Sequence, residues 1–137
     1  KDSYSADSAV RYLTQIGVPR NKIVIGAAFY GRIWENVIDT NNGLSQDAKF
    51  RSAISFDNLN SLDKGFEFYW DENAMAPYGF NKTKNKFLSF DNTRSVSLKT
   101  KYAIDQDLKG IMFWQLGHDL PKDGLLDAIK NEVYNKD

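Results

Sequence analysis

Cysteine is absent from the 137 residues of the chain, which excludes a disulfide framework and thiol chemistry. His118 is the only histidine, and no ligand spacing around it suggests a metal site, so we predict no metal and no cofactor. No apolar run approaches the roughly 18 residues of a membrane span. Lys and Arg together number 18, as do Asp and Glu, and this balance predicts neither nucleic acid nor an anionic membrane as a partner.

Two short apolar stretches stand out in the sequence. One runs from Ile23 to Phe29 and leads into Tyr30, a glycine and Arg32; the other runs from Ile111 to Trp114 and then turns polar. Such runs are typical of parallel strands covered on both faces. We predict that the two are parallel neighbours, with Tyr30 and Trp114 emerging at the same end. Parallel α/β proteins build their sites at that end.

Helical patterns flank the two strands. Ser5 predicts the N-cap of a helix that reaches about Ile16, and Gly17 would end it. Asp91 or Asn92 predicts the cap of a helix over residues 93–107. Apolar spacing in residues 125–133 indicates a last helix.

The segment from residue 34 to residue 90 favours short antiparallel strands. Residues 66–71 alternate between apolar and polar side chains, which is strand periodicity. Residues 77–81 and 86–90 indicate two strands joined as a hairpin by the polar residues 82–85. Ser55 predicts the cap of a short helix over residues 56–62, whereas residues 44–51 give no assignment.

Four motifs occur along the chain in a specific order. Residues 29–32 read Phe-Tyr-Gly-Arg, and residues 110–116 read Gly-Ile-Met-Phe-Trp-Gln-Leu. Between them lie Tyr-Trp-Asp-Glu at 69–72 and Phe-Leu-Ser-Phe-Asp-Asn at 87–92. In this order they resemble glycoside hydrolase family 18, the chitinases and chitinase-like proteins. The resemblance covers essentially the whole chain.

The resemblance implies an α/β fold: the C-terminal part of a (β/α)8 TIM barrel with an inserted α+β subdomain. It places a barrel helix and strand in residues 1–33, the chitinase insertion subdomain in residues 34–92, and the last barrel helix, strand and helix in residues 93–137. A complete barrel needs about 250 residues. We therefore expect the chain, which begins with Lys1, to be a piece of a longer protein that is secreted or held in the cell envelope.

The resemblance also implies a function. The parent protein would hydrolyse β-1,4-linked N-acetylglucosamine polymers such as chitin, with the N-acetyl oxygen of the sugar replacing a protein nucleophile. One alternative is a chitinase-like lectin that binds the sugar without cutting it, and another is a unit with only a structural and carbohydrate-contact role. The family's Asp-x-x-Asp-x-Asp-x-Glu motif, whose Glu is the general acid, and its Met-x-Tyr-Asp strand are absent from the sequence. We predict no catalytic residue and expect the chain alone to be inactive.

Four side chains are predicted to bind the sugar. By resemblance, Trp114 forms the floor beneath the sugar at the cleavage point, with a barrel-core tryptophan as the alternative. Tyr30 and Arg32 would line the cleft and donate hydrogen bonds to the sugar. The alternative for Arg32 is a salt bridge that ties the insertion to the barrel. Trp70 would form either a wall of the groove or part of the insertion's own core.

Two other candidates are weaker. Asp71 and Glu72 are adjacent, so on a strand their carboxylates point to opposite faces and would not converge on one bond. We predict a solvated or turn-capping role for them. His118 lies near the mouth of the predicted strand and could touch the sugar, but a surface position is the favoured interpretation.

The two barrel strands would have unpaired edges in this chain. Such edges are rich in Ile, Val and Phe here and template pairing with another chain. We therefore expect self-association through these strands, while the aromatic residues between 66 and 90 hold a small core of their own.

Overall fold

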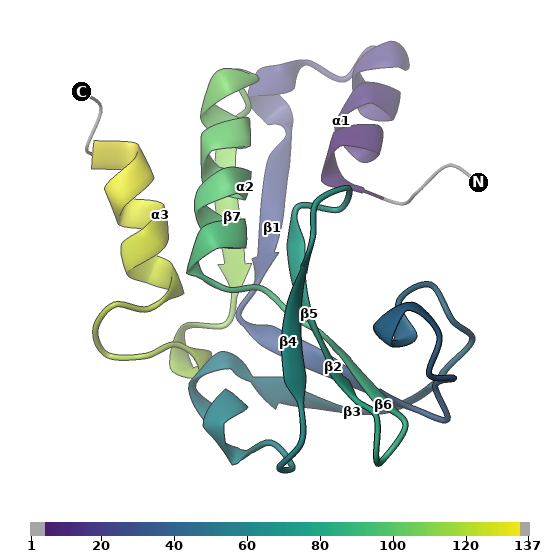
Figure 1. The fold of residues 1–137 in the computed structure, drawn as a ribbon. Helices are drawn as coiled ribbons and strands as arrows, with labels where there is room; N and C mark the ends of the chain where they lie inside the picture. The colour runs from purple at the N-terminus through teal and green to yellow at the C-terminus, as the bar shows by residue number, and fades with distance from the viewer. Residues whose placement is uncertain (1–4, 135–137) are drawn as a thin grey trace.

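The strands form two sheets, one parallel and one antiparallel (Figure 1). The computed structural model describes residues 5–134. A parallel pair consists of β1 (Val24–Ala28) and β7 (Gly110–Trp114). An antiparallel sheet has the strand order β3 (Lys49–Ser55), β2 (Tyr30–Glu35), β6 (Lys86–Ser89), β5 (Ala76–Asn81) and β4 (Glu67–Asp71).

Helices stand beside the parallel pair, which makes the fold mixed α/β (Figure 1). Helix α2 (Thr93–Asp105) packs against both strands of the pair and against α3 (Leu125–Tyr134). Helix α1 (Ala6–Gln15) precedes β1. Short 3-10 turns complete the order: η1 (Arg20–Lys22), η2 (Asn41–Gly43), η3 (Phe56–Ser61) and η4 (Leu116–His118). No helix within residues 5–134 is long and apolar enough to cross a membrane.

The parallel pairing of β1 and β7 is confirmed. The register runs from Val24 opposite Gly110 to Ala28 opposite Trp114. The backbone N–H of Phe29 then donates to the Trp114 carbonyl at 2.9 Å, which extends the ladder by one bond. Both strands therefore end at the same place, and Tyr30 follows there, as predicted.

A hydrophobic core lies between the parallel pair and the two C-terminal helices. Its buried members are Ala27, Phe29, Val96, Leu125, Ala128 and Ile129, with Ile111 and Phe113 packed against them. The rings of Phe29 and Phe113 stack with centroids 4.5 Å apart. These contacts fix the end of β1 against the end of β7.

The prediction that both faces of the pair are covered is wrong for the described chain. Val24 is 46% exposed, Met112 is 49% exposed and Trp114 is 62% exposed. Alternate strand residues point to opposite faces, so these side chains lie on the face away from the buried Ile25 and Phe29. Helices α2 and α3 cover only the buried face of the pair, because their core side chains pack against that face.

The antiparallel sheet confirms the predicted strands and the hairpin, with three differences. Strand β3 arises from a segment that gave no assignment, because the side chains of residues 49–53 are exposed and show no apolar alternation. The predicted helix after Ser55 is the 3-10 turn η3. The predicted boundary between the barrel strand and the insertion, after residue 33, falls inside β2. The chain passes from the parallel pair to the antiparallel sheet after Phe29.

The predicted helix starts at Ser5 and Asn92 are confirmed. In each helix the side chain of the cap residue accepts the backbone N–H of the serine three residues on, and the Oγ of that serine accepts the backbone N–H of the cap residue. Helix α2 ends at Asp105, two residues before the predicted end. Helix α3 is capped from outside its own sequence, because Asp119 accepts the N–H groups of Leu125 and Leu126 at 2.8 Å.

Candidate functional site

A groove opens where the two parallel strands end. Its volume is about 650 Å³, within the range of small-molecule sites in proteins. The lining residues come from β2, β3, the end of β7 and η4: Tyr30, Arg32, Trp34, Phe50, Ala53, Ile54, Ser55, Trp114 and His118. Side chains far apart in the sequence therefore share one surface.

Strand periodicity explains the row of side chains from β2. Tyr30, Arg32 and Trp34 are two residues apart, so they lie on one face of the strand. Their partners on β3 are Ser55, Ala53 and Phe50, in the same order. The sequence prediction that Tyr30 and Arg32 lie together near Trp114 agrees with this placement.

Gly31 holds the other face of β2 close to β6. A Cβ atom built on Gly31 would lie 2.7 Å from Leu88 Cδ1, 3.1 Å from Phe90 Cβ and 3.2 Å from the Ser89 carbonyl oxygen. Real Cβ atoms essentially never approach other atoms within 3.0 Å. The residue between Tyr30 and Arg32 therefore has to lack a side chain for β2 to pack this closely.

Trp114 presents its indole at the end of β7. The side chain is 62% exposed, so within residues 5–134 it is not a core residue. Its backbone is held firmly, because it pairs with Ala28 and its carbonyl accepts the Phe29 N–H. The arrangement is a fixed aromatic platform on an open surface, and such a surface can stack against an apolar ligand face.

Asp91 connects the end of β1 to the start of α2. The side chain is 4% exposed and accepts hydrogen bonds from Ser95 Oγ at 2.7 Å and Lys99 Nζ at 2.6 Å. It also accepts the backbone N–H of Ala28 at 3.1 Å. The carboxylate thus ties the start of α2 to the last residue of β1. Sequence reasoning had Asp91 only as a possible helix cap. Because Asn92 takes that role, the Asp91 side chain is free to reach β1.

Arg32 has no ion pair and no side-chain hydrogen bond with any residue of the described chain, 5–134. The predicted alternative, a salt bridge between the two parts of the chain, is therefore not formed there. The guanidinium carries five N–H donors in a planar fork and faces the groove. It is available to donate to carbonyl or hydroxyl oxygens of a ligand.

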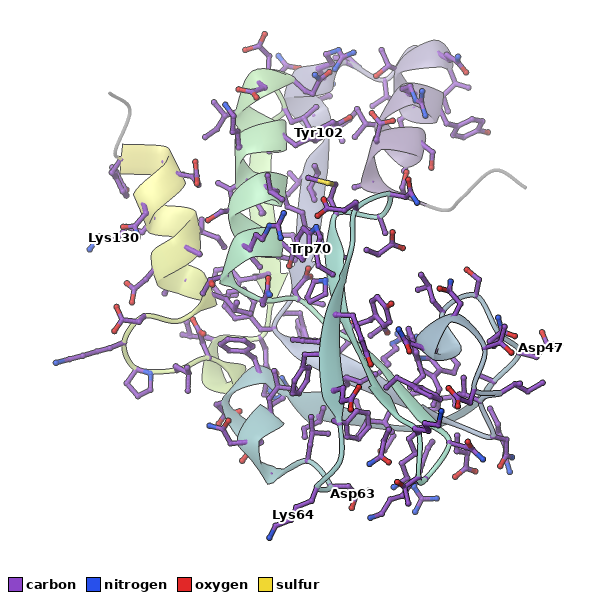
Figure 2. All side chains as sticks on the ribbon, in the orientation of Figure 1. Asp47, Asp63, Lys64, Trp70, Tyr102 and Lys130 are labelled. Atoms are coloured by element: carbon purple, nitrogen blue, oxygen red, sulfur yellow. The ribbon has the colours of Figure 1, made fainter. Side chains whose placement is uncertain are left out.

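Trp70 is not part of the groove. The Arg94 guanidinium lies over its ring at 3.8 Å from the centroid, and Arg94 belongs to the first turn of α2. Figure 2 shows Trp70 beside the lower end of that helix. The indole N–H is buried and forms no hydrogen bond within residues 5–134. Within residues 5–134 Trp70 does not line the groove, and its ring packs against a side chain of α2, which lies outside the segment 34–92 whose core was its other predicted place.

The adjacent carboxylates Asp71 and Glu72 act separately, as predicted. Asp71 Oδ1 accepts the backbone N–H groups of Asn73 at 2.9 Å and Ala74 at 3.3 Å, which caps the turn after β4. Glu72 is exposed and lies 3.8 Å from Arg94. Neither lines the groove.

Trp34, Phe50 and His118 line the groove but are not among the four predicted sugar-binding residues. Trp34 and Phe50 pack edge to face with ring centroids 5.5 Å apart. The periodicity of residues 30, 32 and 34 could have found Trp34, whereas Phe50 lies on the unassigned β3. His118, for which the sequence left open either contact with the sugar or a surface position, is partly exposed and lines the groove; its Nε2 lies 2.9 Å from Gln115 Nε2.

The chemistry of the groove is that of binding. No Asp or Glu lines it in the described part of the chain, and residues 5–134 contain no cluster of His, Asp and Glu that could hold a metal ion. What it offers is aromatic surface, one unpaired cation and a few hydroxyl groups. These groups can hold a neutral ligand that has both apolar faces and polar edges.

Comparisons with known proteins agree on one family. Residues 1–119 match the family described as glycosyl hydrolases family 18. Chitinase A1 of Niallia circulans is 37% identical over 117 residues, which cover 77% of this chain and 17% of that protein. The chain spans less than a third of the length of the curated relatives it matches.

Solved structures give the same result. Chitinase ChiW from Paenibacillus sp. FPU-7 superposes with a TM-score of 0.89 and 39% identity, over 96% of this chain and 16% of that one. A family 18 N-acetylglucosaminidase from Paenibacillus barengoltzii gives a TM-score of 0.81 and 38% identity, over 93% of this chain and 38% of that one. The resemblance inferred from the four motifs is confirmed.

Proposed function

We propose that the groove is part of the substrate cleft of a chitinase-like enzyme, because this chain belongs to glycosyl hydrolase family 18. The substrate class is β-1,4-linked N-acetylglucosamine polymers. The observation that carries the proposal is the convergence of Trp114, Tyr30 and Arg32 at the common end of two parallel strands. The curated relatives that the chain resembles are named chitinases, which favours hydrolysis over the lectin alternative.

Each of the three side chains has a distinct part in binding. The exposed indole of Trp114 supplies an apolar platform for the face of a sugar ring. Tyr30 contributes a phenolic hydroxyl that can donate or accept, and Arg32 contributes unpaired N–H donors. Sugar hydroxyl and acetamido oxygens are suitable acceptors for both. Neutral sugars need no counter-charge, in keeping with the zero formal charge of the chain.

Bond cleavage in this proposal depends on groups outside the chain. In the substrate-assisted mechanism a carboxylic acid protonates the leaving oxygen while the N-acetyl oxygen attacks the anomeric carbon. The groove has no carboxylate among its described lining residues, and the acid-bearing family motif is absent from the sequence. This chain would orient the sugar, and the longer protein would supply the acid.

The same proposal gives the fold its place in a larger molecule. We assign β1 and β7, with their helices, to the last part of a (β/α)8 barrel, and the antiparallel sheet to an inserted subdomain. High TM-scores over more than nine-tenths of the chain support the placement. The relative ChiW is described as a cell-surface-expressed enzyme, which supports an exported parent.

A binding titration tests the proposal. Residues 1–137 should bind a trisaccharide of N-acetylglucosamine, detected by tryptophan fluorescence and calorimetry, and should not hydrolyse a chromogenic chitobioside. Trp114→Ala should abolish measurable binding because it removes the stacking platform. Phe68→Ala is the matched control, since Phe68 is 57% exposed but lies outside the groove. Unchanged binding by Trp114→Ala would refute the assignment of the groove.

A further inference from the structure

We infer that Asn42 is a site of spontaneous deamidation, that the folded turn η2 slows the reaction, and that the isoaspartate product cannot re-form that turn. The site lies in the segment between β2 and β3, residues 36–48. In Figure 1 this segment is the dark blue loop that follows β2. None of its described residues lines the proposed substrate groove, so the inference does not depend on the proposed function.

The sequence singles out Asn42. It is the only asparagine in the chain that is followed by a glycine, Gly43. An asparagine deamidates when the backbone nitrogen of the next residue attacks its side-chain carbonyl carbon, and a glycine leaves that nitrogen unhindered because it has no side chain. Asn42 is exposed, and its carboxamide makes no hydrogen bond within residues 5–134. Its side chain is therefore free to meet the Gly43 nitrogen.

The reaction needs water and no other reactant. The Gly43 nitrogen forms a bond to Asn42 Cγ, and the bond from Cγ to Nδ2 breaks. The proton of the Gly43 nitrogen leaves with the amide group as ammonia, and a cyclic imide remains. Water then opens the imide at either carbonyl. Cleavage at Cγ gives aspartate, whereas cleavage at the backbone carbonyl gives isoaspartate, in which the main chain continues through Cγ.

The folded turn opposes the first step. The Gly43 N–H donates to the Thr40 carbonyl at 3.0 Å, so its nitrogen is held away from the attack and retains its proton. Beside the turn, the Asp39 carboxylate pairs with Lys82 Nζ at 2.6 Å, which fastens the segment to the hairpin between β5 and β6. Deamidation of the folded chain therefore requires that the turn opens first.

The backbone conformation of the turn favours such opening. Asn41 and Asn42 both have φ of 51°, and Gly43 has φ of 76°. The left-handed region is uncommon for residues other than glycine, although asparagine tolerates it better than most. Because three successive residues adopt it, the closed turn depends on the contacts that hold it.

Isoaspartate at residue 42 would prevent the turn from closing again. Its additional main-chain carbon displaces Gly43, which is buried against two side chains. A Cβ atom built on Gly43 would lie 2.6 Å from Phe80 Cδ2 and 3.0 Å from Val37 Cγ1, so the site has no room for a shifted backbone. Either product also adds one carboxylate to a chain whose formal charge is zero.

Mass spectrometry of the folded chain over time tests the inference. Residues 1–137 should gain the mass of an amide-to-acid exchange at Asn42 before any other asparagine, and more slowly than a peptide of residues 38–47 in the same buffer. Lys82→Gln should speed the reaction by about 1.4- to 5-fold, the range that the loss of one exposed ion pair gives. Lys101→Gln removes the exposed pair with Asp105 on α2 and is the matched control, which should leave the rate unchanged.

Three results would overturn the inference. A folded chain that reacts as fast as the peptide would show that the turn does not slow the reaction. A chain whose Asn42 is intact after the peptide has reacted completely would show that Asn42 is not a site, as would an earlier reaction at another asparagine. Equal rates in Lys82→Gln and Lys101→Gln would remove the role of the ion pair in holding the turn closed.

Hydrogen exchange on the product tests the effect on the turn. The Val37 N–H donates to the Asn85 carbonyl at 3.0 Å, which ties the start of the segment to the hairpin. In the isoaspartate form, purified by ion exchange, the amides of Val37 and Gly43 should exchange faster than in the unmodified chain. Asn42→Asp adds the charge without the additional main-chain carbon and should keep their protection. Unchanged exchange in the isoaspartate form, or an equal loss in Asn42→Asp, would contradict the inference.

Discussion

The antiparallel sheet and the parallel pair cover their own surfaces to different extents. In the antiparallel sheet, β5 lies between β4 and β6, and Tyr78, Phe80 and Leu88 are buried. Stacked rings of Tyr69, Tyr78 and Phe87 run across these three strands, with centroids 5.2 and 5.5 Å apart. The parallel pair buries one face against helices and leaves the other open.

This difference teaches where each region obtains its stability. In the antiparallel sheet the main side-chain contacts are made between strands of the same sheet. The parallel pair has half of its contact surface facing outward, with Val24 and Met112 about half exposed. A complete barrel would place further strands beside such a pair. We therefore expect the antiparallel sheet to be the more self-sufficient of the two regions.

Phe29→Ala should have the largest effect, because Phe29 joins the regions. Its side chain is fully buried, its N–H bonds to Trp114 and its carbonyl accepts the N–H of Phe56. Loss of a buried phenylalanine should lower the free energy of unfolding by about 3–5 kcal/mol. Urea denaturation measures the loss, and hydrogen exchange should show both sheets affected. An effect confined to β1 and β7 would break the idea of a shared joint.

Leu88→Ala should act more locally. Leu88 is fully buried in β6, and its truncation should cost about 2–5 kcal/mol. Amides of β5 and β6 should exchange faster, with a smaller change in β1. Met112→Ala is the counterpart in the other region; because Met112 is 49% exposed, its effect should stay within about 0.5 kcal/mol. Equal losses from the two substitutions would remove the contrast between the sheets.

Self-association should depend on the parallel pair alone. The open face and the unpaired edges of β1 and β7 favour contact with a second chain. We expect the wild type to associate, and the double variant Val24→Lys, Met112→Lys to remain monomeric, in light scattering across a dilution series. Phe68→Lys places one lysine on the antiparallel sheet and should not change the association. A monomeric wild type would show that the pair needs no partner.

The smallest effect should come from acid. Hydrogen bonds from Lys84 and Lys86 lower the pKa of Asp63 from 3.8 to about 2. Because the folded-state pKa is the lower one, the stabilisation is present above pH 3.8 and is lost as the pH falls through about 2. Asp63→Asn should therefore lose less stability than the wild type in urea titrations between those pH values. A double Lys84→Gln, Lys86→Gln variant should behave like Asp63→Asn, and an unaltered pH profile would contradict the assignment.

Much of the fold could be predicted because its signals are local. Ser5 and Asn92 cap their helices through residues three positions away, and the turn residues 82–85 close a hairpin between neighbouring strands. Strand β3 had no such signal, since it pairs through its backbone while its side chains face solvent. The open face of β1 and β7 was not predictable, because burial depends on which elements lie across a strand.

The site divides along the same line. Tyr30 and Trp114 could be placed together because parallel strands end at one edge. The position of Trp70 could not be predicted, because strand alternation indicates which face of the strand it occupies but not which residue packs on it. That residue is Arg94. The place of Phe50 in the groove was not predicted because its strand was not predicted. The contact of Asp91 with Ala28 was not predicted because the two residues are 63 positions apart in the sequence.

The close approach of Gly31 to β6 also limits how the groove could change. Substitutions at Tyr30 and Arg32 alter side chains that project into open space, so a library at these two positions samples new ligand preferences on an intact frame. Substitution at Gly31 would instead push β2 away from Leu88 and shift both of its neighbours at once. Engineering of specificity in this triplet is therefore a two-position problem, with the central residue held constant.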